Sequence, residues 1–143
     1  MILFRNRVSG GFNSENDFMA ELSDFRTLEC WKKCRDLRIV LKLELISKLP
    51  ADEKYKLTDQ IIRASRSTTN NLAEGWGKFH YKDQVKYCYQ ARGSCAELID
   101  HILIAEEEGY CSKELCEKLV PQVQEAMRLI NGYINYLNKR SKE

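Results

Sequence analysis

The chain has 143 residues, of which 43% are hydrophobic and 31% are charged, and its formal net charge is +2. This length suits a single domain. No segment approaches the ~20 consecutive apolar residues of a membrane-spanning helix, and "MILFRNRVSGGF" carries two arginines where a signal peptide would be apolar. From these features we expect a cytoplasmic protein that makes no membrane contact.

Six cysteines are present, and in the cytoplasm they are expected to be reduced. A zinc site would require closely spaced cysteine pairs or partner histidines, but neither His80 nor His101 stands at ligand spacing from a cysteine. We therefore expect the cysteines to serve as small core residues, and we predict no metal and no cofactor.

Residues 1–24 show no sustained hydrophobic period, which predicts a flexible N-terminal arm; Met19 is an alternative start, in which case residues 1–18 would not belong to the native protein. From Phe25 onward, apolar residues recur at three- and four-residue steps, as in amphipathic helices. Four helices are predicted, and no segment shows the alternation of a strand. The first is predicted over residues 25–47, and the second begins at residue 50 and stops within residues 75–77. The third is predicted over 81–109 and the fourth over 112–137.

The connectors between these helices are short, and several carry local signals. Leu49-Pro50 ends the first helix, and Pro50 suits the first turn of the second. Gly109 supplies a C-terminal stop for the third helix, and Ser112 can cap the fourth. Four helices of comparable length joined in this way predict an all-α, antiparallel, up-and-down four-helix bundle over residues 25–140.

The segment "RASRSTTNNLAEGWGK", residues 63–78, is rich in small polar residues where a helix would normally show an apolar face. The third helix contains a similar segment, "ARGSCAEL". We expect a contact seam in which two helices approach closely, with a polar network between them or between two copies of the chain. The alternatives are nucleic-acid contact by the arginines, and catalysis by paired carboxylates, for which no motif is present. The predicted network comprises Gln60, Arg63, Ser67, Asn71, Glu74, Arg92 and Glu97.

The third helix is also apolar over a wide arc, because Tyr87, Ala91, Leu98 and Ala105 lie outside its core stripe. A helix that needs cover on two sides in a domain this small predicts an oligomer interface. Homo-oligomers are usually closed and symmetric.

Charge is segregated along the chain. Residues 25–48 carry seven cations and three acids, a net of 7 − 3 = +4, whereas residues 79–110 carry three cations and six acids, a net of 3 − 6 = −3. The first cluster is either a solvated face or a phosphate-binding surface, and repetition around an oligomer would multiply its phosphate contacts. The predicted nucleic-acid-binding residues are Lys32, Lys33, Arg35, Arg38, Lys42 and Lys78.

Two weaker signals accompany this cluster. Lys139, Arg140 and Lys142 near the C-terminus could add to a basic surface. Tyrosines such as Tyr81 and Tyr87 could stack on unpaired bases, although their helical spacing favours packing.

Three segments together resemble the four-helix-bundle proteins of the 23S rRNA intervening-sequence family. They are "LECWKKCRDL", "KLPADEKYKLTDQIIRASRSTTNNLAEGWGK" and "YCYQARGSCAELIDHILIAEEEGY", and the likeness runs from Phe25 to Leu137. Its most specific parts are Q-x-x-R-A-x-x-S, N-x-A-E-G-x-G and A-R-G-S-x-x-E-L. The chain departs from the family pattern at Lys78, where arginine is usual, and at Thr68-Thr69 and His80-Tyr81. Lysine at position 78 weakens any argument for a bidentate phosphate clamp there.

The resemblance implies a bundle that assembles into a ring-like homopentamer and has no catalytic activity. It also implies that the proteins of this family are encoded within insertions of large-subunit rRNA genes. A related branch serves as the accessory protein of diversity-generating retroelements and binds nucleic acid and a reverse transcriptase. We therefore expect a non-enzymatic oligomeric protein that associates with RNA through basic surfaces. The alternative is an accessory scaffold subunit that holds a reverse transcriptase on its nucleic-acid template.

Overall fold

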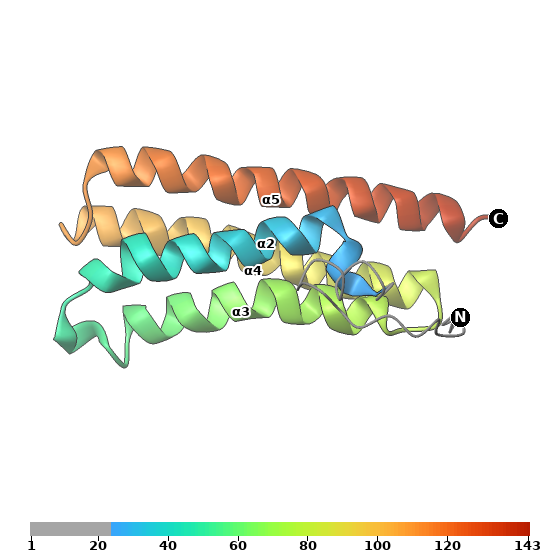
Figure 1. Ribbon diagram of the computed structural model, residues 1–143, viewed down its shortest axis with the longest axis horizontal. Helices are drawn as coiled ribbons and strands as arrows, with labels where there is room; N and C mark the ends of the chain where they lie inside the picture. Colours follow the sequence, from blue (N-terminus) through green and yellow to red (C-terminus); the bar gives the residue numbers. More distant parts are fainter. Residues whose placement is uncertain (1–23) are drawn as a thin grey trace, which may run out of the picture.

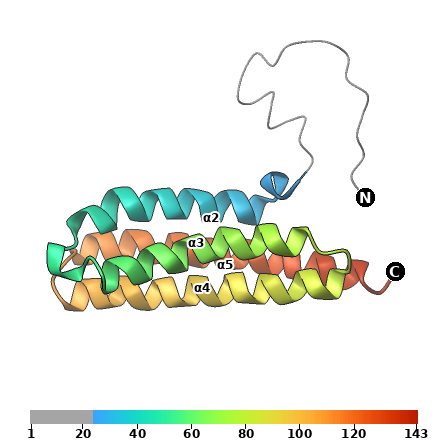
Figure 2. The ribbon, with the colours of Figure 1, turned by 90° about the horizontal axis from the view of Figure 1, so that it is seen from below.

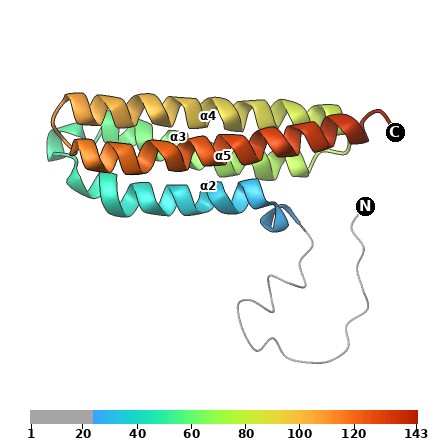
Figure 3. The same ribbon diagram turned by 90° about the horizontal axis from the view of Figure 1, so that it is seen from above.

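The computed structural model describes residues 24–143, which form four helices in an antiparallel bundle (Figure 1). The helices are α2 (Glu29–Val40), α3 (Leu57–Trp76), α4 (Tyr81–Glu107) and α5 (Lys113–Arg140). Consecutive helices are neighbours, and α5 closes the bundle against α2 (Figures 2 and 3). The predicted all-α four-helix bundle is confirmed, and no strand forms between residues 24 and 143. The predicted N-terminal arm lies, apart from Asp24, outside the described residues.

The first predicted helix begins at Glu29 rather than at residue 25, because Leu28 is extended, with φ −71° and ψ 125°. From Glu29 onward it is one rod built from three kinds of helical turn. A short 3₁₀ turn, η1 (Phe25–Thr27), precedes α2, and α2 continues into a π-helical turn, η2 (Leu41–Leu45), and a 3₁₀ turn, η3 (Ile46–Lys48). Leu49 is extended, with φ −72° and ψ 139°. The residue before a proline disfavours helical backbone, so the rod ends where Leu49-Pro50 predicted.

The start of the second helix differs from the prediction. Pro50 begins only a 3₁₀ turn, η4 (Ala51–Glu53), and α3 does not begin until Leu57. The reason is a side-chain cap: Oε2 of Glu53 accepts a hydrogen bond from the backbone N–H of Leu57 at 3.0 Å. This cap satisfies a donor at the new helix end that would otherwise be free.

The corner between α4 and α5 agrees with the sequence signals. Gly109 has φ +76°, the left-handed conformation that glycine adopts at the end of a helix. The hydroxyl of Ser112 accepts a hydrogen bond from the backbone N–H of Leu115 at 3.1 Å. Ser112 therefore caps α5 as predicted.

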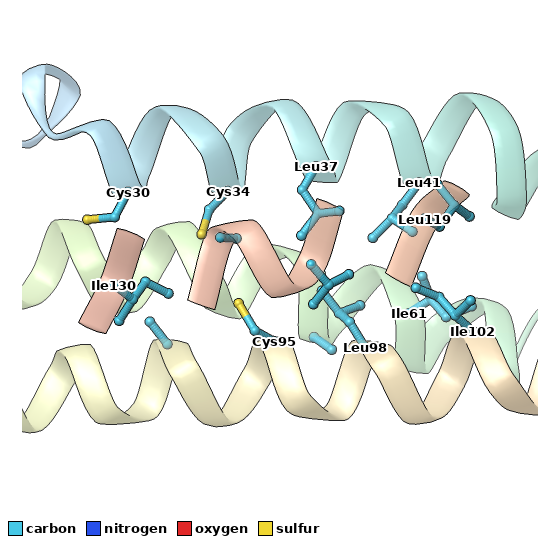
Figure 4. Close-up of a cluster of buried hydrophobic side chains, with 14 of the residues drawn as sticks. Cys30, Cys34, Leu37, Leu41, Ile61, Cys95, Leu98, Ile102, Leu119 and Ile130 are labelled. Carbon is cyan, nitrogen blue, oxygen red and sulfur yellow. The ribbon is translucent and has the colours of Figure 1, made fainter. Parts of the chain in front are cut away.

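The core is a stack of leucine and isoleucine side chains with cysteines among them, and Figure 4 shows Cys30, Cys34 and Cys95. The sulfurs of Cys34 and Cys95 face each other between α2 and α4 in this view. Burial raises the pKa of Cys30 and of Cys88 to about 12, and the neighbouring sulfur of Cys34 together with burial raises the pKa of Cys95. All six cysteines are buried and free, which confirms their expected role as core residues.

The wide apolar arc of α4 is covered within a single chain. Ala91, Leu98 and Ala105 have no exposed surface, and Tyr87 is half-buried against Gly75 of α3. Each helix of a four-helix bundle packs against two neighbours, here α3 and α5 for α4, so a wide arc needs no further cover. The arc therefore gives no support for an oligomer, and the homopentamer stays a prediction from the family resemblance.

Candidate nucleic-acid interface

Three of the predicted cations share one edge of the first rod, on the side of α3. Arg35, Arg38 and Lys42 follow one another at three- and four-residue steps, which places them on one helical face. Nη1 of Arg38 donates a hydrogen bond to Oγ1 of Thr69 on α3 at 2.6 Å. This bond fixes the edge against α3, and we call the surface formed by Arg35, Arg38 and Lys42 the α2 basic edge.

Thr69 is the buried acceptor that holds Arg38 in place. Its hydroxyl also donates to the backbone carbonyl of Arg66 at 3.2 Å. Because a threonine hydroxyl can donate and accept at once, both of its roles are satisfied. Arg66, whose carbonyl accepts this bond, is a further exposed cation one turn before Thr69 on α3.

Arg35 is held by an aromatic ring rather than by a strong ion pair. Its guanidinium carbon lies 5.5 Å from the centroid of the Trp31 ring, within the range of a cation–π contact. Its Nη2 atom lies 3.4 Å from Oδ1 of Asp36, a long contact on an exposed surface, where such pairs contribute little. The Nε atom of Arg35 is buried, so the donors available for a phosphate are those of its terminal nitrogens.

The other predicted cations lie elsewhere. The Lys32 ammonium pairs with Glu29 at 3.3 Å in its own helix. Lys33 lies near Glu125 of α5: a hydrogen bond from Arg128, with a smaller contribution from Lys33, lowers the pKa of Glu125. Lys78 lies in the turn between α3 and α4, with its ammonium 5.3 Å from the ring centroid of Tyr87. The six predicted residues therefore do not form one continuous patch.

The small polar residues of α3 meet α4 at a short hydrogen-bonded contact. The hydroxyl of Ser94 donates to the hydroxyl of Ser67 at 2.8 Å. Nδ2 of Asn71 donates to the same hydroxyl at 2.9 Å and to the Ser67 carbonyl at 2.8 Å. One turn further on, a Cβ atom added to Gly75 would stand 2.7 Å from that of Tyr87. We call this contact, formed by Ser67, Asn71, Gly75, Tyr87 and Ser94, the α3–α4 seam.

Beside the seam lies an open groove of about 600 Å³ between α3 and α4. Nε2 of His101 lies 3.0 Å from Oε1 of Glu97, and His101 is only 6% exposed, so the histidine fixes this carboxylate at the edge of the groove. Arg63 does not reach across to α4, because its side chain is 78% exposed and pairs with Asp59 one turn earlier at 3.4 Å. The groove is lined by Gln60, Arg63, Ala64, Ser67, Glu97, Asp100 and His101.

The predicted polar network is therefore only partly assembled within one chain. Ser67 and Asn71 join in the seam, and Gln60, Arg63 and Glu97 line the groove. The side chains of Glu74 and Arg92 are exposed and make no hydrogen bond or ion pair with any residue from 24 to 143. Their part in a network between two copies of the chain stays a prediction.

Three residues of these surfaces were not anticipated from the sequence. Arg66 was not among the predicted residues, yet it is exposed one turn before Thr69, which accepts the hydrogen bond from Arg38. Asp100 and His101 follow Glu97 by three and four residues, a helical spacing that could have placed them on the same face.

Metal binding and membrane insertion have no support in the described part of the chain. Between residues 24 and 143, no three His, Cys, Asp or Glu side chains converge as a metal site would require. Within the same range, none of the helices combines the length and the apolar character required to cross a bilayer.

A family model described as "23S rRNA-intervening sequence protein" matches residues 26–132. The matched range begins just before α2 and ends within α5, so it includes the α2 basic edge, the seam and the groove. A comparison with curated proteins gives no match. Because the family model covers most of the sequence, the chain belongs to the 23S rRNA-intervening sequence protein family.

Proposed function

We propose that the protein is a non-enzymatic, cytoplasmic protein that associates with RNA by docking phosphates on the α2 basic edge. The observation that carries this proposal is the joint presentation of Arg35, Arg38 and Lys42 along one helix edge, with Arg38 bonded to Thr69 of α3. Acidic residues are concentrated on α4 instead, so the two sides of the bundle differ in charge.

The docking is electrostatic and does not read sequence. Arginine presents several N–H donors in a plane and can hold a phosphate with two parallel hydrogen bonds. Contacts to the phosphate backbone position a protein on nucleic acid but carry no base information. The bond from Arg38 to Thr69 uses one nitrogen of the guanidinium and fixes its orientation in advance.

Assembly into a homopentamer, as the family resemblance implies, would repeat the α2 basic edge around a ring. Each copy would then add its own phosphate contacts to the same RNA. Linked sites bind with an effective concentration set by their geometry, so overall affinity grows well beyond that of one edge. Self-association and RNA binding are therefore parts of one proposal.

Salt-dependent binding to RNA tests the proposal. We expect the triple variant Arg35→Gln, Arg38→Gln, Lys42→Gln to bind more weakly and to reduce the slope of log affinity against log salt. The reduction should be about 0.7 for each phosphate of a single strand that is no longer neutralised. Glutamine keeps an uncharged N–H donor at position 38, and thermal unfolding checks that the variant is folded. A matched control neutralises Lys54, Lys56 and Lys113, which lie near the opposite end of the bundle from the C-terminus. Equal slopes for the two triple variants would contradict the proposal.

The second candidate is an accessory scaffold that holds a reverse transcriptase on its template. The groove between α3 and α4 favours this candidate, because Glu97 and Asp100 offer carboxylates to a basic protein segment. Purification from native cells, with sequencing of bound nucleic acid and identification of bound protein, separates the two candidates. Loss of a co-purifying reverse transcriptase in a Glu97→Gln, Asp100→Asn variant, with RNA binding retained, would support the scaffold.

A further inference from the structure

One end of the bundle exposes aromatic rings among lysine and arginine side chains. The turn between α3 and α4 lies at this end, together with the last residues of α5 (Figures 1 and 3). The ring of Phe79 is 90% exposed, and its one ring contact among the described residues is an edge contact with His80 at 5.0 Å between centroids. A phenylalanine exposed to this extent offers its ring to a flat partner.

A shallow hollow of about 240 Å³ lies at the same end and begins at the residue after Phe79. It is lined by His80, Tyr81 and Lys82 of the α4 start and by Ser141 of the α5 end. The guanidinium carbon of Arg140 lies 5.9 Å from the centroid of the Tyr81 ring and so borders the same hollow. His80 makes no side-chain cap to α4, which leaves its ring nitrogens available to another partner.

The charge at this end is positive, and the charge at the other end is negative. Residues 77–83 and 136–143 carry Lys78, Lys82, Lys139, Arg140 and Lys142 against Asp83 and Glu143, a net of 5 − 2 = +3. Residues 48–56 and 106–114, at the opposite end (Figure 2), carry four lysines and six acids, a net of 4 − 6 = −2. Both acids of the positive end already have partners, Lys86 at 3.9 Å and Arg140 at 3.2 Å.

We propose that this aromatic and basic end binds an unpaired segment of RNA, with one base stacked on Phe79 and the flanking phosphates held by Lys78, Lys82 and Arg140. The proposal rests on the proposed RNA association and adds a second contact to it. Bases of a duplex are already stacked on one another, whereas an unpaired base has a free face for an aromatic side chain. The α2 basic edge therefore docks phosphates of any RNA, and the Phe79 end selects single strands.

An anionic lipid surface would also attract lysines beside an exposed phenylalanine. The end of the bundle that carries Phe79, however, suits a smaller and flatter ligand. Membrane binding by a helix relies on a long apolar face that enters the interface. Here the exposed rings are those of Phe79 and the half-exposed Tyr136, and the hollow at the same end is lined by His80, Tyr81, Lys82 and Ser141. These features match a stacked base with its phosphates better than a bilayer.

The test compares the full chain with two variants that each remove one equally exposed aromatic ring. Phe79→Ala removes the proposed stacking ring. Tyr55→Ala is the control, because Tyr55 is 84% exposed with the Lys54 ammonium 5.3 Å from its ring centroid, but it lies at the negative end. Each protein is titrated with a labelled single-stranded RNA and with the same strand annealed to its complement, at several salt concentrations.

We expect Phe79→Ala to lose about 5- to 100-fold in affinity for the single strand, the range for one stacked base. Its duplex affinity and its salt slope should not change, because stacking releases no counterions. Phe79→Trp should retain single-strand binding, and Tyr55→Ala should match the unmodified chain. Thermal unfolding at an unchanged temperature confirms that the variants are folded.

Three results would overturn the inference. If Phe79→Ala bound the single strand as well as Tyr55→Ala does, Phe79 would have no role in stacking. Equal losses on single strand and duplex would assign Phe79 a structural role. If Phe79→Ala lost binding to phosphatidylserine vesicles but kept its RNA binding, the ligand of this end of the bundle would be a lipid surface. Failure of the proposed function would give a different result. The triple variant of the α2 basic edge would then bind RNA with the same salt slope as the unmodified chain.

Discussion

Gly75 of α3 lies directly against Tyr87 of α4. A Cβ atom on Gly75 would stand 2.7 Å from the Cβ atom of Tyr87 and 3.2 Å from the backbone carbonyl oxygen of Gln84. Real Cβ atoms do not approach another atom so closely, and both obstacles are near or within the backbone of α4. Glycine is therefore required at this point of the seam for α3 and α4 to pack at their present separation.

Replacing Gly75 with alanine should destabilise the bundle by about 1–3 kcal/mol, the usual cost of overpacking. Gly93 provides the matched control, because it also lies inside a helix but a methyl group placed on it would have no atom within 4 Å. Gly93→Ala should stabilise the protein by up to about 1 kcal/mol, since alanine favours helix more than glycine does. Urea unfolding monitored by circular dichroism gives both values. A Gly75→Ala variant as stable as Gly93→Ala would show that the helices can separate freely.

The hydrogen bond from Ser94 to Ser67 should couple α3 to α4. The single variants Ser67→Ala and Ser94→Ala and their double variant form a thermodynamic cycle. Because the hydroxyls are 2.8 Å apart and Ser94 is buried, we expect a coupling energy of about 0.5–1.5 kcal/mol in the free energy of unfolding. Ser47, which is exposed and bonds only within its own rod, replaces Ser67 in the control cycle. The control cycle should be additive, and additivity in both cycles would exclude a stabilising contact between the serines.

Local chemistry explains which parts of the fold were predictable from the sequence. Ser112 and Gly109 were correctly assigned because a helix cap depends on a few adjacent residues. The start of α3 was misplaced because the sequence shows only the proline at position 50. The hydrogen bond from the Leu57 N–H to the side chain of Glu53 depends on how the turn between these residues folds. The hydrophobic period was strong enough to give the bundle regardless of this error.

The candidate sites were less predictable, because they depend on which helix lies beside which. The sequence marked Arg38 as a cation of the first helix but could not reveal that Thr69 of α3 accepts its hydrogen bond. The sequence predicted that Arg63 would join a polar network with α4, yet its side chain pairs with Asp59 of its own helix. Partners between helices follow from rotation and spacing, which the sequence of one helix does not determine.

The contact between Glu53 and Tyr110 should make stability depend on pH. The hydroxyl of Tyr110 donates to Oε1 of Glu53 at 3.0 Å, joining the α4–α5 corner to the turn before α3. The Leu57 N–H and the Tyr110 hydroxyl hold the pKa of Glu53 below its usual value, and the bond to Glu53 raises the pKa of Tyr110. A carboxyl with a lowered pKa contributes stability above its unfolded pKa and loses it as the pH falls through the folded pKa.

We therefore expect Tyr110→Phe to lower the melting temperature near neutral pH and to do so progressively less in acid, as Glu53 becomes protonated. At alkaline pH the raised pKa of Tyr110 works in the other direction, so its contribution should be lost as the pH rises above the usual value of 10. Melting curves of the unmodified chain and of Tyr110→Phe across the pH range measure both effects. Tyr136→Phe is the control, since Tyr136 is exposed and makes no bond to a carboxylate in the described chain. A difference between the chain and Tyr110→Phe that is constant with pH would contradict the role of Glu53.

The buried cysteines should report the opening of the bundle one region at a time. Cys34 and Cys95 have no exposed surface at the centre of the core (Figure 4). Thiolates are the reactive form, and burial also keeps the pKa of Cys30 and Cys88 near 12, so alkylation of these four residues requires global unfolding. Cys111 is 9% exposed at the α4–α5 corner, where local opening is easier. With iodoacetamide and peptide mass spectrometry at increasing urea, Cys111 should be modified first, and the core cysteines should follow the circular dichroism transition. Modification of Cys34 or Cys95 at the rate of Cys111 in the folded protein would mean that α2 detaches before the rest of the bundle unfolds.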